Sequence, residues 1–88
     1  MNLEDKTIAI TGIGGFIGLR MADVATDRGM AVRGLEVSDE AAEDARQTGA
    51  DVIVGDVRDA EPVARLLQGA DIVFHTAAIV EESGPLEL

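Results

Sequence analysis

A glycine-rich segment at residues 11–18 constrains this chain more than any other part of it. The segment reads Thr-Gly-Ile-Gly-Gly-Phe-Ile-Gly and follows an apolar, β-branched run that is typical of a buried parallel strand. A stretch with the apolar spacing of a helix comes after it and stops at Gly29. The segment is therefore predicted at a strand-to-helix turn, a position that separates a phosphate-binding turn from a chance cluster of glycines.

Each glycine of this turn has its own expected role. Gly12 lets the chain turn off the strand, Gly15 lets the backbone approach a pyrophosphate, and Gly18 lets the helix lie against the strand. The amides of Gly15, Phe16 and Ile17 are expected to point outward at the helix N-terminus, where the dipole favours an anion. The predicted ligand is a dinucleotide. The alternative is a glycine-rich turn without a ligand, since ten glycines make accidental matches easy.

The rest of the chain alternates strands and helices. Strands are predicted at 7–11, 31–36, 51–54 and 71–75, and glycines at 29, 49 and 69 end the helices between them. This order predicts an α/β fold, a Rossmann-like three-layer αβα arrangement whose four-stranded parallel sheet has the order 3-2-1-4. It is an incomplete doubly wound fold, one half-domain over residues 1–88 with no second domain.

Helical periodicity also predicts which side chains are buried. In the first helix these are Ile17, Met21, Val24 and Ala25. In the third they are Val63, Leu66 and Leu67, and Asp59 is expected to cap that helix.

The composition excludes several classes of protein. A net charge of −10, from 17 acidic residues against seven lysines and arginines, argues against nucleic-acid and membrane partners. The absence of cysteine excludes disulfides and thiolate metal sites, and one histidine without paired ligand spacing predicts no metal site. No apolar run reaches the length of a membrane span, and the acidic amino terminus predicts a cytoplasmic protein. The acidic surface fits either ordinary solubility or adaptation to high salt.

Glu36 stands 18 residues after Gly18, at the end of the second predicted strand. A carboxylate there can accept hydrogen bonds from both hydroxyls of an adenosine ribose and would repel a 2′-phosphate. The sequence therefore favours NAD over NADP. The alternative is an ordinary exposed glutamate. Arg33, two residues before the strand end, is interpreted as a solvated residue rather than a 2′-phosphate ligand.

Three landmarks together carry a family resemblance: the turn at 11–18, the pair Gly55 and Asp56 with Asp59 following, and the run His-Thr-Ala-Ala at 75–78. With them, nearly the whole chain resembles the amino-terminal part of the extended short-chain dehydrogenase/reductase family, which comprises NAD-dependent epimerases, dehydratases and hydroxysteroid-dehydrogenase-like enzymes. The landmarks are specific for the family and not for a substrate.

The resemblance implies roles for individual residues. The amides of Phe16 and Ile17 would hold the pyrophosphate and Glu36 the ribose. Asp56 would bond the adenine amino group, and Val57 would pack on the ring. Alternatively, Asp56 is a turn or cap carboxylate. Small side chains beside the fourth strand would let the cofactor pass, a requirement that core packing also explains; these are Ala77 and Ala78.

The resemblance implies no catalytic residue in this chain. The family's chemistry uses a tyrosine and a lysine four residues later, and the chain has no tyrosine, while its single lysine, Lys6, precedes the first strand. His75 is interpreted as a hydrogen-bonded anchor of a buried strand end rather than a general base. The expected function is the dinucleotide-binding part of a truncated epimerase, dehydratase or dehydrogenase. The alternatives are a stand-alone non-catalytic nucleotide-binding or sensing module, and a fragment without useful binding.

The fourth strand would lie at an unpaired edge of the sheet. An apolar uncovered edge invites pairing with another chain. Self-association through this edge is therefore predicted.

Overall fold

The computed structural model describes residues 3–76. A short 3₁₀ turn at Leu3–Asp5 precedes alternating strands and helices. Their bounds are β1 Thr7–Thr11, α1 Phe16–Asp27, β2 Ala31–Glu36, α2 Asp39–Arg46, β3 Asp51–Val54, α3 Ala60–Leu67 and β4 Ile72–His75. All neighbouring strands are parallel, and the order β3-β2-β1-β4 confirms the predicted α/β topology.

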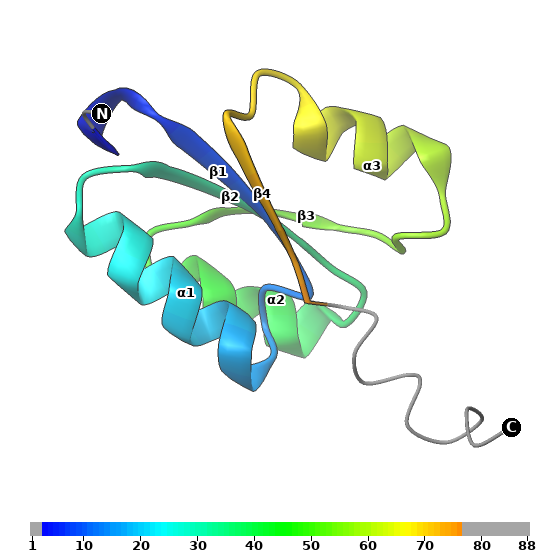
Figure 1. The fold of residues 1–88 in the computed structure, drawn as a ribbon. Coiled ribbons are helices and arrows are strands. Elements are labelled where there is room, and N and C mark those ends of the chain that lie inside the picture. The colour runs from blue at the N-terminus through cyan, green and yellow to red at the C-terminus, as the bar shows by residue number, and fades with distance from the viewer. Residues whose placement is uncertain (1–2, 77–88) are drawn as a thin grey trace, which may run out of the picture.

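The helices cover both faces of the sheet, with α1 and α2 on one side and α3 on the other (Figure 1). The core on the α1 and α2 side is the larger, and it is centred on the fully buried Ile10 and Ile13. The α3 side holds a smaller cluster of Ala9, Leu35 and Leu66. The three predicted layers are therefore present.

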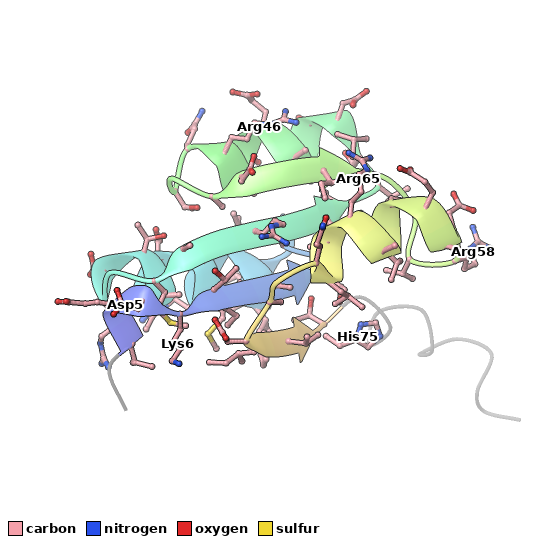
Figure 2. All side chains as sticks on the ribbon, turned by 90° about the horizontal axis from the view of Figure 1, so that it is seen from above. Asp5, Lys6, Arg46, Arg58, Arg65 and His75 are labelled. Atoms are coloured by element: carbon pink, nitrogen blue, oxygen red, sulfur yellow. The ribbon has the colours of Figure 1, made fainter. Side chains whose placement is uncertain are left out.

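The strand register brings the chemically interesting residues to one edge. Thr11 pairs with Leu35 on β2 and with His75 on β4, and Glu36 pairs with Val54 on β3. The strands therefore end together, at what we call the carboxyl edge of the sheet. Figure 2 shows His75 and Arg58 toward this edge, with Asp5 and Lys6 toward the opposite one.

The buried faces of two helices differ from the periodicity-based prediction. In α1 the fully or nearly fully buried positions are Gly18, Ala22 and Ala25, whereas Ile17 is 50% and Val24 43% exposed. The small residues face the sheet because they let the helix approach it closely, which rotates the larger side chains outward. In α3, Leu67 is likewise 42% exposed, while Pro62 and Leu66 are buried.

The interpretation of Arg33 as a solvated strand residue was wrong. It is half-buried on β2, and its Nη1 atom donates to the carbonyl oxygens of Leu66 at 2.8 Å and Gln68 at 2.6 Å, with a longer contact to Arg65 at 3.3 Å. These carbonyls lie at the C-terminal end of α3, where helices lack internal donors and where a positive charge is favourable. Arg33 thus caps α3 from the sheet.

Removing this cap should measurably destabilise the fold. We expect Arg33→Met to lower the free energy of unfolding by about 1–3 kcal/mol, because it leaves the α3 carbonyls without their charged donor. Urea denaturation measures the change. Arg65→Met is the matched control, since it removes only an exposed ion pair to Glu61 and should cost at most about 0.5 kcal/mol. Equal effects of the two substitutions would contradict the capping role.

Strand β4 forms one edge of the sheet, and its two faces differ. Ile72 and Phe74 are half-buried against the α1-side core, while Val73 is 53% exposed on the opposite face. The expectation that β4 is a fully buried strand was therefore wrong. The reason is that α3 packs over β2 and β3 and leaves this side of β4 uncovered.

Candidate functional site

The turn between β1 and α1 is held by backbone hydrogen bonds at the carboxyl edge. The Gly12 amide donates to the Leu35 carbonyl at 2.9 Å, and Gly12 adopts a positive φ of 67° that glycine tolerates best. The Gly15 amide donates to the Gly12 carbonyl at 3.0 Å. The Gly15 amide is therefore committed to the turn, contrary to the expectation that it points outward.

The amides that follow remain at the exposed start of α1. The first helical hydrogen bond runs from the Leu19 amide to the Gly15 carbonyl at 2.9 Å, so the amides of Phe16, Ile17 and Gly18 precede it. Among residues 3–76, none of these three has a recorded acceptor. The Phe16 side chain is 92% exposed. Two of the three predicted pyrophosphate donors, Phe16 and Ile17, are thus suited to an external anion.

Gly15 and Gly18 face different surroundings. A Cβ atom on Gly18 would collide with the Gly12 carbonyl oxygen and lie 2.8 Å from the Ile13 Cα atom. A Cβ on Gly15 would meet nothing closer than the Gly12 oxygen at 3.4 Å, and its φ of −79° suits any residue. The fold therefore requires glycine at 18 and does not require it at 15, which fits a role for Gly15 toward something outside the chain.

Glu36 lies beside the glycine turn and is fixed by backbone donors. Its Oε1 atom accepts the Gly14 amide at 2.8 Å, and its Oε2 atom accepts the Val37 amide at 3.1 Å. A carboxylate offers about four acceptor positions, so each oxygen keeps about one for another donor. Two acceptor positions side by side match the two hydroxyls of a ribose.

Asp56 follows β3 on the same edge, next to Glu36 through the bond from the Gly55 amide to the Glu36 carbonyl at 3.0 Å. Arg58 grips its carboxylate. The Arg58 backbone amide donates to Oδ1 at 2.9 Å, its Nε lies 3.1 Å from Oδ1 and 3.3 Å from Oδ2, and its Nη2 donates to Oδ2 at 2.8 Å. The turn carboxylate considered as an alternative for Asp56 is therefore present, and it leaves 27% of the side chain exposed.

These contacts change the acidity of Asp56. The side-chain hydrogen bonds from Arg58, followed by the Arg58 backbone amide, lower the pKa of Asp56 from 3.8 to about 2. The folded pKa is depressed, so the stabilisation is present above the unfolded pKa of about 4 and is lost as the pH falls toward about 2.

This sign gives a pH-dependent prediction. The excess stability of the wild-type chain over Arg58→Met should be constant from pH 7 to about 4 and should shrink between about pH 4 and pH 2. Urea denaturation at each pH measures it, and Asp56→Asn serves as the control because it carries no carboxyl group at this position. A wild-type advantage that persists unchanged at pH 2 would contradict the ion pair.

Two exposed valines accompany these carboxylates. Val57, the predicted adenine contact, is 38% exposed directly after Asp56, and Val37 is 64% exposed directly after Glu36. The sequence-based assignment did not include Val37. An apolar residue placed immediately after a strand-ending carboxylate was the available signal, and Val57 stands in the same relation to Asp56.

Polar contacts join the ends of β1 and β4. The Thr11 hydroxyl oxygen lies 2.7 Å from Nδ1 of His75, and it accepts the Thr76 amide at 3.0 Å. The Thr76 hydroxyl donates to the Thr11 carbonyl at 2.5 Å. His75 therefore makes the anchoring hydrogen bond that its position suggested. Ala77 and Ala78, predicted to flank the cofactor, lie outside the described residues.

Other chemistries find little support in residues 3–76. No group of three or more histidine, aspartate or glutamate side chains there is arranged to hold a metal ion. None of the helices in this part of the chain has the length and apolar character needed to cross a membrane.

Comparison with known proteins identifies the family. The sequence pattern of the NAD dependent epimerase/dehydratase family matches residues 8–84. The chain belongs to this family, whose members depend on a nicotinamide dinucleotide, and the match confirms the resemblance to extended short-chain dehydrogenases.

Individual relatives agree with this assignment. A 3 beta-hydroxysteroid dehydrogenase/Delta 5-->4-isomerase of Mycobacterium tuberculosis is 35% identical over 84 residues, 96% of this chain and 22% of that protein. A 4-hydroxy-2-methyl-3-oxo-4-farnesyl-3,4-dihydroquinoline-1-oxide ketoreductase of Stigmatella aurantiaca is 34% identical over 70 residues, 80% of this chain and 21% of that protein. The crystal structure of AibC matches with a TM-score of 0.68 and 27% identity, over 82% of this chain and 23% of that one. The chain thus spans about a fifth of the length of these relatives.

Proposed function

We propose that this chain binds NAD in preference to NADP through the β1–α1 turn and Glu36. The observation that carries the proposal is the bond from the Gly14 amide to Glu36, which fixes a carboxylate beside the exposed amides of Phe16 and Ile17. A pyrophosphate on those amides would leave the adenosine ribose near Glu36, whose remaining acceptor positions suit two hydroxyls. A 2′-phosphate would meet a negative charge there.

The adenine would lie farther along the same edge. In this proposal Asp56 accepts the adenine amino group, and the exposed Val37 and Val57 side chains contact the base. Support comes from the chain order, since both valines directly follow the carboxylates that flank the proposed ribose and base positions. Ala77 and Ala78 remain proposed neighbours of the cofactor from the family resemblance alone.

We propose that these 88 residues act as one cofactor-binding half-domain and do not catalyse a reaction by themselves. The chain contains no tyrosine to accept a proton from a substrate hydroxyl. For the whole protein, the names of the relatives favour hydride transfer between NAD and an alcohol or ketone. The stand-alone, non-catalytic module differs from this proposal only in the partner that it requires, and cytoplasmic location stays a prediction.

Gly15→Ala provides the sharpest test of dinucleotide binding. The added methyl group meets ordinary contact distances inside the chain, so the fold should lose at most about 1 kcal/mol of stability at this helix N-cap position. It would stand where the pyrophosphate approaches the backbone, so NAD affinity should fall about tenfold or more.

The binding is measured by NADH fluorescence with circular dichroism on the same samples. Thr48→Ala is the control, since its hydroxyl only bonds the Ala45 carbonyl after α2. A folded Gly15→Ala variant that binds NADH as well as the wild type would refute the proposed pyrophosphate position.

We further propose that the chain self-associates through β4. Support comes from its place at the sheet edge and from the 53% exposure of Val73. Sedimentation velocity at increasing concentration should show dimers or larger species, and a monomer throughout would refute the proposal.

A further inference from the structure

The contacts between Arg58 and Asp56 occupy most of the acceptor capacity of the carboxylate. Three N–H groups of Arg58 reach it, because the Nε–H is shared between Oδ1 and Oδ2 at 3.1 and 3.3 Å. The other two are the backbone amide on Oδ1 and Nη2 on Oδ2. Against about four acceptor positions on a carboxylate, about one is left.

The same contacts fix where that position points. The side-on Nε and Nη2 pair forms a two-pronged contact that sets the plane of the carboxylate, and the backbone amide two residues after Asp56 closes a local turn. The carboxylate is nevertheless 27% exposed, so its remaining position is accessible from outside. The Arg58 side chain, by contrast, is 85% exposed and contributes little to the core.

We infer that Arg58 is a positioning residue for base recognition: it orients the Asp56 carboxylate so that one acceptor position meets the exocyclic amino group of an aminopurine. The inference rests on the proposed NAD binding and adds a residue and a selectivity to it. A fixed acceptor accepts from an amino group and repels a carbonyl oxygen at the same place. The site should therefore discriminate adenine from hypoxanthine.

The low pKa of Asp56 supports the inference, since an ionised carboxylate can only accept hydrogen bonds. A carboxyl group free to rotate could still bind adenine, but it would also turn away from a carbonyl. Orientation by Arg58 is thus what turns a nearby acid into a selective one.

The test compares NAD with nicotinamide hypoxanthine dinucleotide, which carries a carbonyl in place of the amino group. Titration calorimetry of the wild-type 88-residue chain should show about tenfold or greater preference for NAD. Arg58→Met should reduce this preference to about threefold or less, through weaker NAD binding, while affinity for the hypoxanthine analogue stays within about twofold. Arg58→Lys, which keeps the charge but lacks the two-pronged contact, should be intermediate.

Two controls separate positioning from folding. Asp56→Asn should lose the preference like Arg58→Met, and Arg65→Met should keep it, because Arg65 pairs only with the exposed Glu61 on α3. Thermal unfolding verifies that each variant is folded. If Arg58→Met does not fold, Arg58→Lys and Asp56→Asn still decide the question.

The remaining outcomes are distinct. Equal loss of affinity for both dinucleotides would show a structural role only and overturn the inference. Full preference retained by the Arg58 variants would also overturn it, while leaving NAD binding intact. A wild-type chain that binds both dinucleotides equally would mean that Asp56 does not recognise the base. Binding of neither would remove the proposed function and the inference together.

Discussion

Gly18→Ala is expected to leave little of the chain folded. The added Cβ would collide with the Gly12 carbonyl oxygen and lie 2.8 and 2.9 Å from the Cα and carbonyl carbon of Ile13. All three are backbone atoms of the turn, so no rotamer change can relieve the contact. Ile13 itself is fully buried, and the turn cannot move without disturbing the core.

The size of the effect follows from comparison with the total stability. Overpacking of side chains costs about 1–3 kcal/mol, and a clash with backbone belongs at or above the upper end. A chain of this size has a total stability of roughly 4–13 kcal/mol. We therefore expect the thermal midpoint to fall by more than about 10 °C, or the variant to fail to fold. Circular dichroism melts measure it, with Gly15→Ala as the matched control, and equal midpoints for both variants would contradict the turn geometry.

Glu36→Arg is expected to reverse the cofactor preference. The substitution removes a charged acceptor from the proposed ribose hydroxyls, which should weaken NAD binding by about tenfold to a hundredfold. It also replaces a repulsive charge with an attractive one at the 2′-phosphate of NADP. The ratio of the NAD and NADP dissociation constants should therefore shift by about a hundredfold or more toward NADP.

The design of this experiment must separate charge from local structure. Glu36 accepts the Gly14 and Val37 amides, and arginine cannot, so the turn loses two contacts in this variant. Glu36→Gln is the matched control, because its amide oxygen can keep the Gly14 contact while the charge is removed. It should bind NADP better than the wild type and NAD worse, with a smaller change in the ratio. A ratio unchanged in both variants would show that Glu36 does not face the ribose.

Much of the fold could be predicted from the sequence because short apolar strands alternate with glycine-ended helices. The strand pattern at 7–11 and the glycine turn set the topology, and the structure confirms the order 3-2-1-4. The buried helix faces were harder. Periodicity favours large apolar residues, but Gly18, Ala22 and Ala25 of α1 form the buried face because close approach to the sheet requires small side chains.

Several contacts of single polar side chains could not be predicted. Arg33 reaches across to α3, and no local pattern links a strand residue to carbonyls more than 30 residues away. Asp59 occupies the N-cap position of α3 as predicted, yet within the described residues its side chain makes no capping bond. Ser38, by contrast, accepts the Ala41 amide at 3.2 Å as expected for α2.

The candidate site was predicted in its residues more than in its contacts. Gly12, Glu36 and Asp56 all lie at the carboxyl edge because parallel strands end together there. The use of Gly14 as the donor that fixes Glu36, and of Arg58 as the residue that holds Asp56, depends on tertiary geometry. A sequence shows that a carboxylate ends a strand, but not which of its acceptor positions are already occupied.

Calorimetric titration of the folded chain with NAD and, in parallel, with NADP tests the central claim most directly. Circular dichroism first establishes that the chain is folded, and both low and high salt are used because of the net charge of −10. We expect saturable one-site binding of NAD and at least about tenfold weaker binding of NADP. A folded chain that releases no heat with either dinucleotide, or that prefers NADP, would contradict the account.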